Sequence, residues 1–141
     1  MPVNVFVDTN IWLYSLIQAS EDDARHKIAA KFLDGIKHPV VSTQVIREAT
    51  HNLIKKARMP EDAIQRLISG WYQDCIVQGS SEAQFLLASR LRGLYSFSYW
   101  DSLIVAAALD AKCTTLYSED MQHGQIIDGN LTIMNPFLQI L

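Results

Sequence analysis

The sequence predicts an α/β fold: a five-stranded, mostly parallel sheet sandwiched by helices. Apolar runs of strand length alternate with apolar stripes at helical spacing, which is typical of parallel strands joined by helices. The chain has 141 residues and 49% hydrophobic side chains, a size and composition that suit one compact domain. No internal repeat, low-complexity tract or linker interrupts the sequence. We therefore expect a single domain covering residues 1–141.

The chain opens with a predicted buried strand at residues 3–7, which is rich in Val and Phe. The apolar run at residues 11–17 has helical length. Residues 20–23 are expected to form a turn and to cap a second helix at residues 23–36, whose apolar side chains recur at helical spacing. Pro39 lies just beyond the end of that helix and favours its termination there.

The next elements are bounded by clear start and stop signals. A short strand is expected at residues 40–42, followed by a helix that begins near residue 43 and is capped by Ser42 or by the residue after it. The apolar stripe of this helix extends as far as residue 57. A proline ends this helix and opens the next one at residues 60–73, since Pro is favoured at the first helical position. A third strand follows at residues 75–77.

The C-terminal part repeats the alternation of helices and strands. Its helix at residues 81–94 begins with a capping box, Ser-Glu-Ala-Gln. The following helix carries residues 103–109 without a polar side chain, so we expect it to be buried on most of its surface. The remaining expected elements are that helix at residues 100–112, a strand at residues 114–117, a polar loop at residues 118–129 and a strand at residues 131–134.

Charge and cysteine content bound the function classes. The formal net charge of -3 gives no electrostatic reason to expect a nucleic-acid partner, and it does not exclude one, because binding depends on local patches. Cys75 and Cys113 form no CxxC pair and lie beside apolar residues, which predicts buried thiols in a reducing compartment. Asp8 interrupts the first apolar segment too early for a secretion signal, and the apolar runs are too short to span a bilayer. We therefore expect a cytoplasmic protein with no membrane partner.

Four acidic residues each have an ordinary structural explanation when taken alone. Asp8 follows the first strand, where it could be only a helix cap. Glu48 lies off the apolar stripe of its helix, as a solvated side chain would. Asp101 completes a capping pattern that begins at Ser98. Asp120 follows the fourth strand in a loop, where acids are common.

Taken together, the four acids predict a metal site. Ligands of parallel α/β sheets bind beyond the carboxyl ends of the strands, and both Asp8 and Asp120 follow strands. Helices that run antiparallel to the strands begin at this edge, which places Asp101 there, and Glu48 lies about a turn and a half into the helix after the second strand. Because converging carboxylates repel, a divalent cation would offset their charge, and Mg²⁺ or Mn²⁺ prefers such oxygen ligands.

The same residues carry a resemblance to a known family. The chain resembles PIN-domain ribonucleases, and most closely the VapC toxins of type II toxin–antitoxin systems. The resemblance spans nearly the whole chain. Its motifs are VFVDTNIWLY with Asp8, VIREATHNL with Glu48, SYWDSLIVAAAL with Asp101, and LYSEDMQHGQIIDGNLTIMNPF with Asp120.

That resemblance implies a Mg²⁺- or Mn²⁺-dependent endoribonuclease. It implies that Asp8, Asp101 and Asp120 bind the metal, and that Glu48 either binds metal or orients the attacking water. Asn10 and Ser118 would position these carboxylates without binding the metal themselves. The resemblance also implies an RNA substrate, a cognate VapB-type antitoxin and a homodimer. The number of metal ions stays open between one and two.

RNA would have to be held by residues other than the acids. His123 in the final loop is one candidate. The other candidates are the cations that end the third helix and lie on the fifth: Lys55, Lys56, Arg58, Arg90 and Arg92. For each of these cations, a solvated side chain that complements a helix dipole is the alternative.

Two other functions compete with the nuclease. A phosphotransferase of the haloacid dehalogenase type needs a second Asp two residues after the first, where this chain has Asn10. A catalytically inert PIN module would bind RNA or protein without cutting, and the complete set of acids argues against it. Cleavage of labelled RNA with Mg²⁺, Mn²⁺ or EDTA distinguishes these functions.

Overall fold

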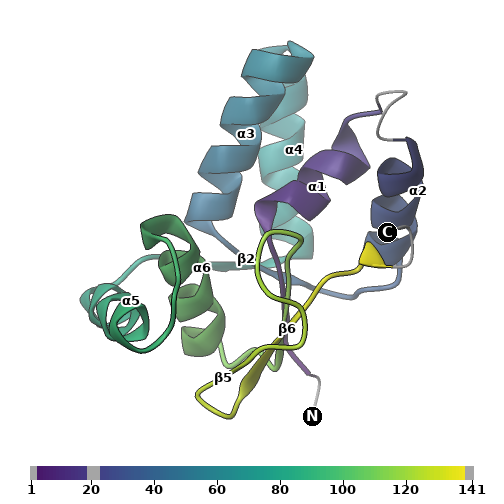
Figure 1. Ribbon diagram of the computed structural model, residues 1–141. Coiled ribbons are helices and arrows are strands. Elements are labelled where there is room, and N and C mark those ends of the chain that lie inside the picture. The colour runs from purple at the N-terminus through teal and green to yellow at the C-terminus, as the bar shows by residue number, and fades with distance from the viewer. Residues whose placement is uncertain (1–2, 19–22, 139–141) are drawn as a thin grey trace.

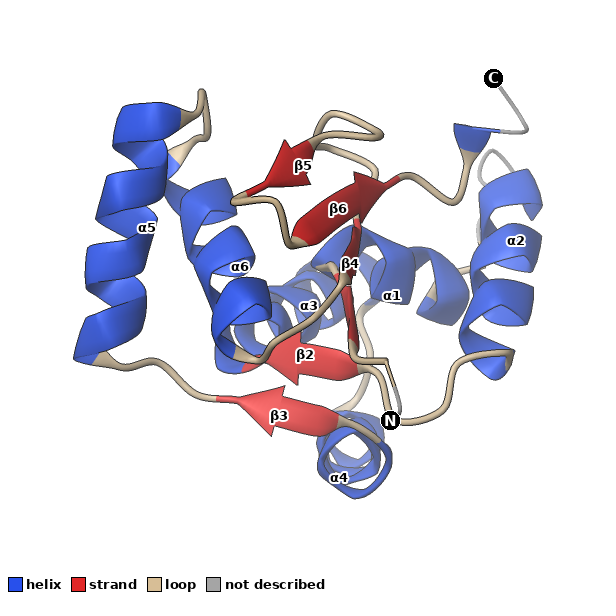
Figure 2. Cartoon of the chain, turned by 90° about the horizontal axis from the view of Figure 1, so that it is seen from below, coloured by secondary structure: helices blue, strands red, loops and turns tan. Residues whose placement is uncertain are grey.

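The fold is a twisted sheet between two groups of helices, as Figures 1 and 2 show. The computed structural model describes residues 3–18 and 23–138, so the turn expected at residues 20–23 lies largely outside the described residues. Within the described ranges, the helices are α1 (Thr9–Leu16), α2 (Asp23–Asp34), α3 (Thr43–Ala57), α4 (Glu61–Asp74), α5 (Glu82–Leu94) and α6 (Tyr99–Asp110). The strands are β1 (Val5–Val7), β2 (Val40–Ser42), β3 (Ile76–Gln78), β4 (Thr115–Tyr117), β5 (Ile126–Ile127) and β6 (Leu131–Met134).

The sheet confirms the predicted α/β class and its mostly parallel character. Its six strands run in the order β3-β2-β1-β4-β6-β5. Every neighbouring pair is parallel except β5 with β6. β1 is central and pairs with β4 through Val7 and Tyr117, so the residues that follow these two strands come out side by side at one edge of the sheet.

Side chains that alternate along β1 build the core on both faces of the sheet. Phe6 packs into the larger cluster with α3, α5 and α6, whereas Val7 packs into a smaller cluster with α1 and α2. Figure 2 shows α5 and α6 on one side of the strands and α2 on the other. α6 is buried along most of its length, as its apolar sequence predicts. The two clusters hold the central strand rigidly between them.

Serine and aspartate caps fix where the helices begin. Ser42 accepts a hydrogen bond from the Val45 N–H at the start of α3, and Ser81 accepts one from Gln84 at the start of α5. Ser98 accepts one from the Asp101 N–H at the start of α6. The three cap residues are those that the sequence offered for these helices, and α6 begins one residue before the expected start at residue 100.

Two local expectations were wrong. The structure has a sixth strand, β5, within residues 118–129, which the sequence predicted to be a loop. Its two residues pair antiparallel with β6, and this pairing comes from tertiary contact, not from a strand pattern in the sequence. The first helix begins at Thr9, two residues before the expected start, because Asp8 caps it directly.

The two cysteines differ in burial, although the sequence predicted that both would be buried. Cys113 is buried and Cys75 is half-buried, and both are free thiols. Burial raises the pKa of Cys75 to about 11 and of Cys113 to about 12, so neither thiol is activated as a nucleophile. None of the described helices is both long and apolar enough to cross a membrane.

Candidate active site

Asp8 lies at the junction of β1 and α1 and is almost fully buried. Its backbone N–H donates to the Tyr117 carbonyl oxygen (3.0 Å), which continues the pairing of β1 with β4. Its Oδ1 accepts from the Thr9 N–H (2.7 Å), and its Oδ2 accepts from the Ser118 hydroxyl (2.9 Å). Only 8% of Asp8 is exposed. The strand ends therefore hold this carboxylate in one orientation.

Burial makes the charge of Asp8 unfavourable. The pKa of Asp8 is raised to about 6, mainly because burial removes water from the carboxylate, and the negative charges of Asp120 and Glu48 raise it further. The hydrogen bonds from Thr9 and Ser118 act in the opposite direction, because they favour the ionised form. A cation placed beside Asp8 would relieve both the desolvation and the repulsion.

Asp120 follows β4 by three residues and faces the start of α1. Its Oδ2 accepts from the Asn10 side-chain amide (2.7 Å). Its backbone N–H donates to the Ser118 hydroxyl oxygen (3.3 Å), the same group that donates to Asp8. Ser118 is fully buried. Asn10 and Ser118 therefore hold the two aspartates by hydrogen bonds.

Glu48 approaches the site from α3. Its Oε1 accepts from the side-chain amide of Gln44 (2.7 Å), one helical turn earlier, and its Oε2 accepts from the Thr9 hydroxyl (3.3 Å). The spacing of four residues between Gln44 and Glu48 signals their contact in the sequence. The contact of Thr9 with Glu48 has no such signal, because it joins residues 39 positions apart.

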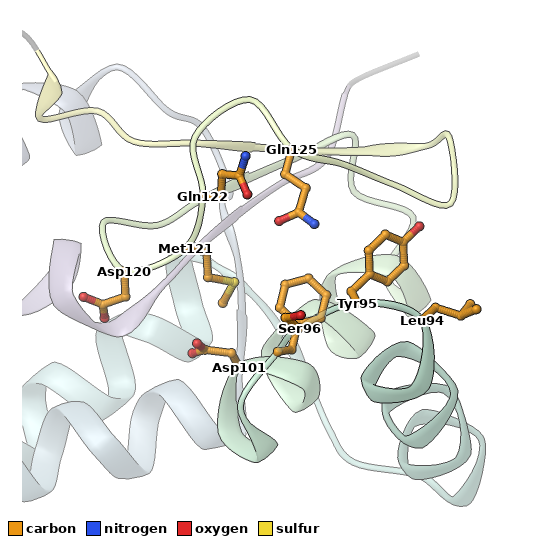
Figure 3. A pocket seen from close by; sticks show the side chains of 9 residues that line it. Leu94, Tyr95, Ser96, Asp101, Asp120, Met121, Gln122 and Gln125 are labelled. Carbon is orange, nitrogen blue, oxygen red and sulfur yellow. The ribbon is translucent and has the colours of Figure 1, made fainter.

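Asp101 lies in the first turn of α6, facing Asp120. Burial raises the pKa of Asp101, and the charges of Asp120 and Glu48 raise it further, whereas a hydrogen bond with Ser98 lowers it. Figure 3 shows the carboxylates of Asp101 and Asp120 at the same end of a pocket. The structure thus brings the four predicted acids to one end of the sheet: Asp8, Glu48, Asp101 and Asp120.

Among the described residues, the four acids have no Lys or Arg partner. None of the four forms an ion pair with a Lys or Arg of the described residues, whereas Glu119, the direct neighbour of Asp120, is paired with Arg25 (3.3 Å). Glu119 also accepts from the Tyr14 hydroxyl (3.4 Å). A donor set made of carboxylate oxygens, with uncompensated charge, fits a hard divalent cation such as Mg²⁺ or Mn²⁺.

The carboxylate oxygens are held by protein donors and not in a closed metal cage. Within residues 3–18 and 23–138, no three His, Cys, Asp or Glu side chains are already arranged around a common point at ligand distance. Asp120 is turned toward Asn10, and Glu48 toward Gln44. Metal binding at this site would therefore require small side-chain rotations, which the exposed Asp120 can make most easily.

Several other candidate side chains have structural partners. His123 Nδ1 accepts a hydrogen bond from the Asn135 N–H (2.9 Å), so His123 ties the loop after β4 to the residue that follows β6. Arg90 pairs with Asp128, and Arg92 donates to Ser102 and lies over the ring of Tyr99. These intramolecular contacts explain the positions of His123, Arg90 and Arg92 without invoking RNA.

Comparisons with known proteins agree with the geometry. The family profile for the PIN domain matches residues 5–126. No curated protein sequence is significantly similar to the chain.

Solved structures with a similar fold come from toxin–antitoxin systems. A structure described as a toxin–antitoxin complex from Klebsiella pneumoniae is 17% identical with a TM-score of 0.72, covering 96% of this chain and 98% of the other. VapC20 of Mycobacterium tuberculosis, described as a toxin that cleaves the sarcin–ricin loop, is 17% identical with a TM-score of 0.65, covering 82% and 91%. VapBC2 of Rickettsia felis, bound to a DNA fragment of its promoter, is 17% identical with a TM-score of 0.65, covering 94% and 98%.

Proposed function

The chain belongs to the PIN-domain family, and on that premise we propose that it is a metal-dependent endoribonuclease that hydrolyses RNA phosphodiester bonds. One observation carries the proposal: four carboxylates from distant parts of the chain meet at one end of the sheet without a cationic partner among the described residues. Burial of the Asp8 carboxylate makes its negative charge unfavourable. A bound cation would offset that unfavourable charge.

In the proposed mechanism, Asp8, Asp101 and Asp120 would hold Mg²⁺ or Mn²⁺. Such a cation, when bound, would supply a lowered pKa for an attacking water molecule and would neutralise charge on the reacting phosphate. Glu48 binds metal or orients the attacking water, and its two oxygens are directed by Gln44 and Thr9. Ser118 joins Asp8 to the backbone of Asp120, so it fixes the spacing of two metal-binding residues.

The proposal includes control by a protein partner. The similar structures from toxin–antitoxin systems support the interpretation that the chain is a VapC-like toxin neutralised by a VapB-type antitoxin. A groove of about 440 Å³ lies between polar residues of α3, Glu48 among them, and apolar residues of α5 and α6, and it supports docking of an antitoxin segment next to the acids. Co-purification with the product of the adjacent gene tests this partner.

A homodimer is also part of the proposal. Outside the groove assigned to the antitoxin, α5 exposes two apolar side chains that a monomer would leave in water, Leu86 and Leu94. Sedimentation velocity of the isolated chain tests the dimer, and a monomer at micromolar concentration would contradict it.

Cleavage of end-labelled RNA tests the nuclease itself. We expect fragments with Mg²⁺ or Mn²⁺ and none with EDTA. Asp8→Asn keeps the shape of the side chain but weakens the metal site, so we expect its cleavage rate to fall by about a thousandfold or more while it stays folded. Asp34→Asn removes an exposed acid of α2 and serves as the matched control with full activity.

The alternative outcomes are distinct. Cleavage that persists in EDTA, or in folded Asp8→Asn protein, contradicts the proposed metal chemistry. RNA that is retained but never cut identifies an inert binding module, and acid-labile phosphoprotein identifies a phosphotransferase.

A further inference from the structure

A polar pocket adjoins the acids on the side away from α3. It has a volume of about 410 Å³, within the range of small-molecule sites. Asp101 and Asp120 form one end of it, so the pocket and the proposed catalytic site are continuous (Figure 3). The rest of the pocket is lined by the connection between α5 and α6 and by the loop after β4: Leu94, Tyr95, Ser96, Phe97, Met121, Gln122 and Gln125.

Two glutamine amides on one wall have no hydrogen-bond partner within the described part of the protein. The side chains of Gln122 and Gln125 line the pocket, and neither forms a hydrogen bond with the described part of the chain. Figure 3 shows the amide of Gln125 directed across the pocket toward Tyr95. Gln125 is half-buried, a position at which polar groups normally find partners, so its amide is available for a ligand or for water. Gln122 lies at the exposed rim of the pocket, where its amide is hydrated and can also reach a ligand.

The backbone holds this wall in place. The Gln125 N–H donates to the Gln122 carbonyl (3.3 Å), and the Ile133 N–H donates to the Gln125 carbonyl (2.9 Å). Gly124 between the glutamines has a φ of +84°, a conformation that favours glycine, and its N–H donates to Ile133 (2.7 Å). The two amides are therefore presented from a turn anchored on β6.

Aromatic rings form the opposite wall. The ring centroids of Tyr95 and Phe97 lie 5.6 Å apart with an interplanar angle of 39°. The Tyr95 hydroxyl accepts from the Asp128 N–H (3.1 Å), which fixes the position of its ring. Such rings provide flat apolar surfaces on which a planar ligand can stack.

The chemical character of the lining residues indicates which kind of ligand the pocket can bind. Among the described residues that line the pocket, none is Lys, Arg or His, so a phosphate has no cation to bind there. Amides facing aromatic rings instead suit an uncharged, planar group with hydrogen-bonding edges. RNA supplies such a group when an unpaired base is turned out of its stack.

We propose that this pocket binds one unpaired base of the RNA, adjacent to the phosphate that is cut, and that Gln125 and Gln122 recognise its edge. The inference rests on the proposed nuclease function, because the acids at the end of the pocket position the phosphate. The amides present both donors and acceptors, so they distinguish bases by their hydrogen-bonding edges, whereas stacking on Tyr95 tolerates any base.

The first test measures base preference at each position around the cleavage site, using short single-stranded RNA substrates that differ at one position. We expect Gln125→Ala to reduce the preference at one position by about five- to a hundredfold, the range expected when a paired contact to a base edge is lost. Gln73→Ala removes an exposed glutamine of α4 outside the pocket, and we expect its preference to match the wild type.

The second test does not depend on cleavage. Uncharged nucleosides are added to the metal-free protein, and the side-chain amide signals of Gln122 and Gln125 are followed by nuclear magnetic resonance. We expect these signals to shift with one nucleoside more than with the others, while the Gln73 amide signal stays in place.

The two tests separate the two proposals. The base pocket is overturned if Gln125→Ala keeps the base preference of the wild type and the amide signals do not shift with any nucleoside. Metal-dependent cleavage by the wild-type protein would in that case leave the nuclease proposal intact. Shifted amides without any metal-dependent cleavage overturn the nuclease and support the base pocket.

Discussion

The acid site has a buried half and an exposed half, and different effects dominate the behaviour of the carboxylates in each half. Asp8 and Ser118 lie at the ends of the neighbouring strands β1 and β4 and are closed off from water. Asp120 lies in a loop and is exposed, and Asp101 in the first turn of α6 is half-buried. In the buried half, desolvation dominates the behaviour of the carboxylate, and the pKa of Asp8 rises to about 6.

This difference in burial means that the two halves of the site should affect different properties of the protein. A buried carboxylate without a counter-ion reduces the free energy of unfolding, whereas an exposed one is screened by water and salt. Substitutions in the buried half should therefore change stability in a pH-dependent way, and substitutions in the exposed half should change mainly activity. Each of the following predictions tests this division through the free energy of unfolding.

The largest effect is expected for Asp8→Asn in metal-free protein. Since the folded state raises the pKa of Asp8 from 3.8 to about 6, the folded protein binds more protons than the unfolded chain between these values. The contribution of Asp8 is therefore most favourable below about pH 4 and is lost as the pH rises through 6, a change of about 3 kcal/mol. Asn lacks this titration, so the variant should gain about that much relative to wild type between about pH 4 and pH 7. Urea unfolding at several pH values measures the gain.

Asp120→Asn is the matched exposed substitution. We expect its free energy of unfolding to stay within about 0.5 kcal/mol of wild type across the same pH range. Adding Mg²⁺ at neutral pH should stabilise wild type more than Asp8→Asn. Equal pH profiles for wild type and Asp8→Asn would show that the carboxylate is not desolvated.

An intermediate effect is expected for Ser118→Ala. The fully buried hydroxyl donates to Asp8 and accepts from the Asp120 N–H, and its loss leaves both without this partner. We expect a destabilisation of about 1–3 kcal/mol that is larger at neutral pH than at about pH 5, because the lost donor favours the ionised form of Asp8. Urea unfolding checks the size, with exposed Ser89→Ala of α5 as the control. A loss that is equal at both pH values would separate Ser118 from the ionisation of Asp8.

A smaller effect than that of Ser118→Ala is expected for Arg25→Gln at the outer edge of the site. Arg25 pairs with Glu119 and lies over the rings of Tyr14 and Phe137. We expect a loss of about 0.5–1 kcal/mol that shrinks in high salt, measured by thermal unfolding. Arg66→Gln breaks the pair of Arg66 with Asp62 on the surface of α4 and should cost less. An equal cost for the two variants would mean that the ring contacts of Arg25 contribute nothing.

The elements with strong local signals were the most predictable from the sequence. The strand at residues 40–42 and the start of the helix near residue 43 match the structure, because a proline precedes the strand and Ser42 supplies a side-chain cap for the helix. The convergence of the acids was also predictable, because the carboxyl ends of parallel strands share an edge.

Other features arise only from tertiary contact. β5 has two residues, too few to show a strand period, and it forms because β6 is beside it. The pocket walls come from two connections that are distant in sequence, so no spacing in the chain predicts that Gln125 faces Tyr95. The contact of Thr9 with Glu48 is hidden for the same reason.

Asp8 starts α1, continues the ladder between β1 and β4 through its N–H, and presents the most buried of the four carboxylates. Position 8 will therefore be the most constrained in a saturation scan, since most replacements lower cellular abundance before any loss of catalysis can be scored. Asn, which keeps the cap and the shape, will pass an abundance screen and fail an activity screen. Position 120 will behave in the opposite way, tolerating many residues for abundance and few for activity.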